Sequence, residues 1–142
     1  TFRGGVPIGL NTTSNTLNNY GGAQRPNWTG KDPDRGGDIS NRLNQYYDTT
    51  AFSLPAPYTF GNLGRLLSGL RGPGTANVDL SLCKNIPVRE RVQLQFRFET
   101  FNSFNRPEFG LPGTAIGSPT AGVISTQANT PRDIQFALKL LF

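Results

Sequence analysis

The chain of 142 residues contains no histidine, no methionine and a single cysteine, Cys83. Without histidine, the chain has no Ser-His-Asp arrangement, no histidine-ligated zinc and no use of the commonest general base. One cysteine excludes an intrachain disulfide framework and a zinc site made of several cysteines. We therefore expect a protein that is not an enzyme and that holds no cofactor.

Long apolar runs and targeting segments are also missing. No stretch reaches the roughly 18 apolar residues that a membrane-spanning helix needs, and no N-terminal segment has the pattern of a signal peptide. The first residue is threonine rather than methionine. From this we expect a mature product or a piece of a longer protein.

Turn-forming residues are abundant instead. The chain has 17 glycines and 11 prolines, and only 35% of its residues are hydrophobic, so much of the backbone is predicted to be turn and loop. A formal net charge of +5 allows contact with nucleic acid or anionic lipid. The basic residues are scattered, however, and nucleic-acid binding needs a clustered patch, so no nucleic-acid partner is expected.

The N-terminal half shows little periodicity. Residues 1–10 predict the end of a strand, and residues 11–74 predict a long loop region. Within this region, residues 39–47 predict a short helix with Asp38 or Ser40 as its cap. A loop of this length is unusual in a compact domain unless it is functional or belongs to a larger scaffold.

The C-terminal part, residues 75–142, alternates polar and apolar residues and predicts an all-β fold of antiparallel strands. Strands are expected at 77–84, 91–101 and 132–142, with a turn at 85–90 between the first two. Residues 105–131 are expected to form a loop that holds a short strand at 123–127. One face of the three strands is apolar and carries Val78, Leu80, Leu82, Val92, Leu94, Phe96, Phe98, Ile134, Phe136 and Leu138.

Two settings produce strands with one apolar and one polar face. In a soluble sandwich, the apolar face packs on a second sheet and the polar face meets water. In an outer-membrane barrel, the apolar face meets lipid and the polar face lines the lumen. Strand length does not decide between them, since a transmembrane strand needs about 9–11 residues and two of these strands reach that length.

The last strand favours the barrel. The spacing of Gln135, Ala137, Leu140 and Phe142 resembles the C-terminal signal that the barrel-assembly machinery reads in outer-membrane proteins. Ala137 stands where glycine is usual, and Leu140 stands where an aromatic residue is usual. The resemblance implies that these four residues form the assembly signal and that the partners of the full-length protein include this machinery and outer-membrane lipid.

From about Phe60 onward, the sequence resembles the C-terminal end of TonB-dependent outer-membrane transporters, of the acidobacterial, Oar-like group that has a carboxypeptidase-regulatory-like domain. The resemblance lies in "FGNLGRLLSGLRGPG", "NVDLSLCKNIPVRERVQLQFRFETFNSFNRPEFG" and "NTPRDIQFALKLLF". It implies a non-enzymatic transporter barrel. It also implies a periplasmic turn at 85–90, with extracellular loops at 9–74 and 105–131.

Such a barrel has about 22 strands, and this chain has three or four candidates, so a closed barrel from this chain alone is not expected. Apolar faces and unpaired strand edges promote association. The alternative is therefore a self-assembling extracellular β-rich subunit, in which chains add strands to one another in a homo-oligomer or filament. The expected location is the bacterial outer membrane or the extracellular space.

Other candidate sites are weaker. Asp32, Asp34 and Asp38 lie at alternating positions near glycines and faintly resemble a calcium loop, but the third ligand position is Gly36 and no glutamate follows at the twelfth. A plain turn accounts for them as well. Aromatic residues in the long loop either help to hold a substrate or pack the loop itself; they are Tyr20, Trp28, Tyr46, Tyr47, Phe52 and Tyr58.

Overall fold

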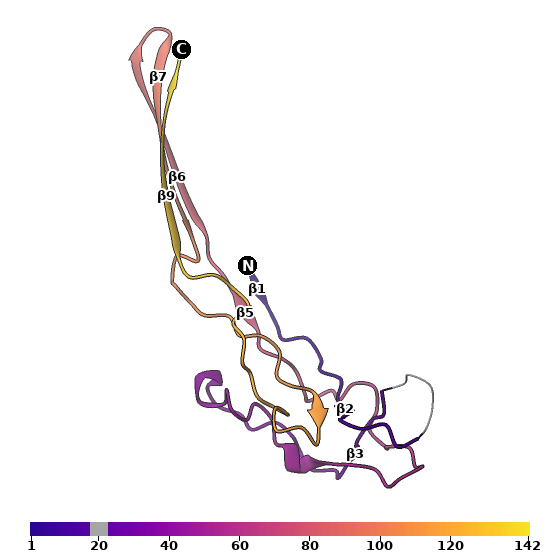
Figure 1. Ribbon diagram of the computed structural model, residues 1–142. Coiled ribbons are helices and arrows are strands. Elements are labelled where there is room, and N and C mark those ends of the chain that lie inside the picture. Colours follow the sequence, from indigo (N-terminus) through magenta and orange to yellow (C-terminus); the bar gives the residue numbers. More distant parts are fainter. Residues whose placement is uncertain (18–22) are drawn as a thin grey trace. The chain divides into compact units, whose positions relative to one another are not determined.

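The computed structural model describes residues 1–17 and 23–142 (Figure 1). The chain divides into two compact units. Unit 1 consists of Thr1–Arg3, Thr75–Glu108 and Gln127–Phe142, and unit 2 consists of Gly4–Gly74 and Phe109–Thr126. In the part of the chain that is described, no helix has the length and apolar character needed to cross a membrane.

Unit 1 contains an antiparallel sheet of three long strands. β6 (Leu80–Arg89) pairs with β7 (Val92–Phe101), which pairs with β9 (Asp133–Leu141). The three strands run side by side in Figure 1. A shorter pair, β1 (Phe2–Arg3) with β5 (Thr75–Ala76), belongs to the same unit. The fold is all-β, as predicted, and the described residues do not close into a barrel.

The first strand of this sheet differs from its prediction at both ends. β6 begins at Leu80 rather than at residue 77, and it continues through Pro87 to Arg89. The predicted turn at 85–90 is wrong, because the chain reverses in two residues, Glu90 and Arg91. Proline lacks an N–H donor, and it is tolerated on edge strands and at bulges. β6 is one of the two outer strands of the described sheet, and the register shifts between Pro87 and Arg89.

The chain leaves β7 through a tight turn that Asn102 holds in place. Asn102 is buried and adopts a positive φ of 49°, which asparagine tolerates better than most residues. Its side-chain amide donates to the carbonyl oxygens of Arg106 and Thr130, at 3.2 and 3.1 Å, and its Oδ1 accepts from the Arg106 N–H. The segment that follows β7 is thereby tied to the segment that precedes β9.

Unit 2 is built from short elements. β2 (Asn11–Thr12) pairs in parallel with β8 (Ala115–Ile116), and β3 (Asn27–Trp28) pairs antiparallel with β4 (Phe52–Ser53). The described residues of the unit also form two 3₁₀ helices, η1 (Ile39–Asn41) and η2 (Thr49–Ala51). The helix predicted at 39–47 is thus only η1, which Asp38 caps as expected. The strand predicted at 123–127 does not form.

Unit 2 nevertheless has a hydrophobic core, to which both of its chain segments contribute. The segment 109–126 is tied to the longer segment by backbone bonds from Tyr46 N to Gly122 O and from Ile124 N to Leu43 O, both 2.7 Å long. All of the buried hydrophobic residues described lie in this unit: Ile8, Leu10, Tyr46, Tyr47, Ala51, Phe52, Leu63, Leu70, Ile116 and Ile124. The two predicted loops therefore fold together as one unit.

Candidate functional site

The β6–β7–β9 sheet presents one apolar face, and the strand register shows how its rows are arranged. Residues paired across neighbouring strands point to the same face of a sheet. Leu82 pairs with Phe98, which pairs with Phe136, and Ile86 pairs with Leu94, which pairs with Leu140. The Phe98 and Phe136 rings lie 5.1 Å apart between centroids.

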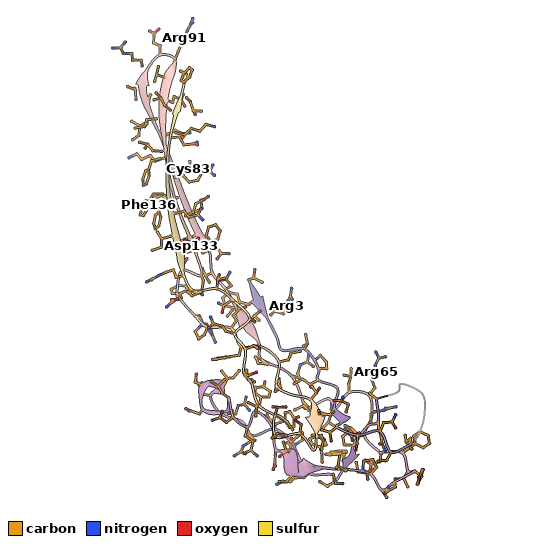
Figure 2. The ribbon with its side chains drawn as sticks, viewed as in Figure 1. Arg3, Arg65, Cys83, Arg91, Asp133 and Phe136 are labelled. Atoms are coloured by element: carbon orange, nitrogen blue, oxygen red, sulfur yellow. The ribbon has the colours of Figure 1, made fainter. Side chains whose placement is uncertain are left out.

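This apolar face is exposed. The side chains of Phe136 and Leu138 are 70% and 69% accessible, and that of Leu82 is 61% accessible. Figure 2 shows Arg91 at the turn, Asp133 at the opposite end of the sheet, and Cys83 and Phe136 between them. Exposed apolar area of this extent indicates a surface that contacts lipid or a partner.

Nearly all of the residues predicted to face lipid or a partner lie on the three long strands, and what they contact stays a prediction. Leu80, Leu82, Val92, Leu94, Phe96, Phe98, Ile134, Phe136 and Leu138 lie on strands at positions that alternate with polar residues. Val78 is the exception, because it precedes β6 and is only partly exposed. The prediction missed Ile86 and Val88, which lie in β6 and are exposed, since these residues were assigned to a turn.

The opposite face of the sheet is polar. The Arg97 guanidinium lies 3.6 Å from the Glu99 carboxylate, and the Ser81 hydroxyl donates to the same carboxylate at 3.3 Å. Nearer to the turn at Glu90 and Arg91, on the same face, the Gln95 amide donates to the side-chain oxygen of Asn85 at 3.0 Å. This face can meet water and hydrogen-bond to polar solutes.

The predicted assembly-signal residues divide between the two faces. Gln135 pairs with Glu99 and Ala137 pairs with Arg97 on the polar face, whereas Leu140 pairs with Leu94 on the apolar face. Phe142 follows β9 and is almost fully exposed. Their role as a signal stays a prediction.

The three aspartates of the weak calcium candidate are engaged in local turns. Asp32 accepts from the Asp34 N–H, Asp34 accepts from Gly36 and Arg42, and Asp38 accepts from the Ser40 N–H. Among the described residues, no group of three or more acidic, cysteine or histidine side chains is close enough together to hold a metal ion.

The loop aromatics have different positions. Tyr46, Tyr47 and Phe52 are buried in the core of unit 2, so they pack the loop, and Phe52 also lines a pocket of this unit. Trp28 and Tyr58 are exposed, and Tyr20 lies outside the described residues.

A pocket in unit 2 was not predicted from the sequence. It has a volume of about 710 Å³ and lies between residues 44–54 and residues 116–121. Its lining includes the side chains of Asn44, Gln45, Thr49 and Ser53. No local pattern indicated it, because its two walls come from segments that are far apart in the sequence.

An exposed apolar face, a polar opposite face and long, separately folded connections define a sheet of the outer-membrane barrel class. The comparison with protein families agrees: the model described as an outer membrane beta barrel domain matches residues 1–135. The chain belongs to this family, and its location is the outer membrane. Searches of curated proteins and of solved structures gave no significant match.

Proposed function

We propose that this chain forms part of the barrel of a TonB-dependent outer-membrane transporter and that it is not an enzyme. The observation that carries the proposal is the three-stranded sheet with one exposed apolar face and one polar face. The resemblance of residues from Phe60 onward to the end of such transporters supports the finer assignment. In this proposal the apolar face contacts lipid, and the polar face lines the barrel interior.

Unit 2 has a distinct role in the proposal. Along the chain, its two segments precede β5 and lie between β7 and β9, whereas β6 and β7 are joined by the two-residue turn at Glu90 and Arg91. Outer-membrane barrels have short periplasmic turns and longer extracellular loops. Unit 2 is therefore proposed to face the outside of the cell and to receive the substrate.

The self-assembling β-rich subunit stays a prediction, and no observation favours it over the barrel. An exposed apolar face and unpaired strand edges motivated that alternative. Membership of the barrel family accounts for both features, because lipid covers the apolar face of such a barrel and neighbouring strands cover the edges.

The transporter role is tested by genetic epistasis in the bacterium that makes the protein. On any nutrient where removal of this protein slows growth, removal of TonB should slow growth at least as much. Removal of both should add nothing further, since the energy for transport comes through TonB. A growth defect that is additive with the loss of TonB contradicts the proposed role.

A further inference from the structure

The pocket in unit 2 is lined by uncharged polar groups. Its residues include Asn44, Gln45, Thr49 and Ser53 on one side, with Leu54 and Pro119 as exposed apolar neighbours. None of the lining side chains is ionisable. Within the described part of the chain, the side chains of Asn44 and Gln45 have no hydrogen-bond partner. The pocket thus offers free amide donors and acceptors next to small apolar surfaces.

The lining of this larger pocket suits a ligand with many hydroxyl groups better than a charged or an apolar ligand. A side-chain amide both donates and accepts, so it can bind neighbouring hydroxyl groups of a sugar. The C–H faces of a pyranose ring can lie against apolar side chains such as Leu54, which is half exposed. A volume of about 710 Å³ lies within the usual range for small-molecule sites.

A second, smaller pocket adjoins the first and brings positive charge. It has a volume of about 410 Å³ and shares Asn44 and Gln45 with its neighbour. Its other lining residues include Arg35 and Arg42. The Arg42 guanidinium is held 4.8 Å above the Tyr46 ring and 3.1 Å from the Asp34 carboxylate, whereas Arg35 is exposed and has no partner among the described residues.

The walls of these pockets are held in place by backbone bonds. The wall 116–121 is closed by turns in which Ser118 N bonds to Ala115 O and Ala121 N bonds to Ser118 O, both at 3.1 Å. Gly117 has a φ of +95°, and a Cβ there would lie 2.8 Å from the Thr13 hydroxyl. A preformed wall lowers the entropy cost of binding.

We propose that unit 2 binds an acidic oligosaccharide. Sugar rings occupy the larger pocket, where Asn44 and Gln45 bind hydroxyl groups, and a carboxylate of the same ligand lies in the smaller pocket beside Arg35. A guanidinium recognises a carboxylate with two parallel hydrogen bonds. The inference concerns binding at equilibrium, so it holds whether or not the barrel is driven by TonB.

Titration calorimetry on the whole protein, purified from membranes in detergent, tests the inference. The probes are tetragalacturonate, its methyl ester and a tetraglutamate peptide. We expect tetragalacturonate to bind about tenfold more tightly than its ester, since a charge-assisted hydrogen bond contributes roughly this factor. The peptide should bind more weakly than tetragalacturonate.

Variants locate the site. Arg35→Gln should remove the preference for tetragalacturonate over its methyl ester. The double variant Asn44→Ala, Gln45→Ala should lower the affinity for both of these sugars several-fold. Arg65→Gln is the matched control, because Arg65 is an exposed arginine of the same unit that lines neither pocket. Three results overturn the inference. They are no binding of either sugar, binding of the peptide as tight as that of tetragalacturonate, and an equal loss of affinity for tetragalacturonate in Arg35→Gln and Arg65→Gln.

Discussion

At the scale of single residues, Tyr47 links the two segments of unit 2. Its ring is completely buried, and its hydroxyl donates to the Gly113 carbonyl at 2.7 Å. Tyr47→Phe should lower the stability of unit 2 by about 1 kcal/mol, because one buried hydrogen bond is lost while the Gly113 carbonyl keeps its bond from the Gly122 N–H. Faster hydrogen exchange in residues 43–48 and 113–124 measures the loss. Tyr58→Phe, at an exposed tyrosine, should change nothing; equal exchange in both variants contradicts the linking role.

Tyr47 also makes the stability of unit 2 depend on pH in the alkaline range. Burial raises the pKa of Tyr47 from its ordinary value of 10.0 to about 12. The neutral phenol is therefore favoured in the folded state, so its contribution to stability is complete below pH 10 and is lost as the pH rises to 12. Protection factors in unit 2, which are corrected for the base-catalysed intrinsic exchange rate, should fall over that interval in the natural chain and should fall less in Tyr47→Phe.

Burial decides what each aromatic residue does, and composition alone could not show it. The sequence left open whether the loop aromatics hold a substrate or pack the loop. Tyr46, Tyr47 and Phe52 pack the core because segments from both parts of unit 2 cover them. Those contacts join positions more than 60 residues apart, such as Tyr47 and Gly113, and no local periodicity encodes them.

At the scale of elements, the long strands could be read from the sequence. β7 and β9 lie within one residue of their predicted bounds, because alternation of polar and apolar residues over nine or more positions is typical of a strand with two unlike faces. The predicted end of β6 was wrong, since Pro87 was assigned to a turn. A register shift between Pro87 and Arg89 accommodates this proline, and such bulges are decided by strand pairing rather than by local sequence.

Lys84 lies within the apolar face of the sheet. Lys84 pairs with Phe96, which pairs with Leu138, and apolar rows lie on both sides of this row. A lysine on the lipid side of a barrel costs about 2–4 kcal/mol near the middle of the membrane. If this face contacts lipid, Lys84→Leu should raise the free energy of unfolding of the whole protein in lipid vesicles by about this amount.

The control for this prediction lies on the opposite face of the same sheet. Lys139 pairs with Gln95 in the polar row, so Lys139→Leu should give no such gain in stability. Denaturant titrations of both variants in the same vesicles separate a lipid effect from a general preference for leucine in strands. An equal gain in the two variants would falsify the assignment of the apolar face to lipid.

At the scale of the whole molecule, the sequence indicated the barrel class but not the folding of unit 2. Residues 11–74 were expected to be a long loop, and glycine, proline and asparagine justified that expectation. The described residues of the unit form two-residue strands and 3₁₀ helices, which are too short to show a helical or strand period. Its order comes from a small core shared by two segments, and its pockets arise from the same long-range packing.

The orientation of the chain in the membrane is the last prediction. Unit 2 should face the outside of the cell and the turn at Glu90 and Arg91 should face the periplasm, because short turns are periplasmic and long connections extracellular. In a Cys83→Ser background, a membrane-impermeant maleimide should label Arg65→Cys on intact cells. It should label Glu90→Cys only after the outer membrane is permeabilised. Both positions are exposed, so labelling in the reverse order would mean that the proposed orientation is inverted and that the pockets of unit 2 meet the periplasm.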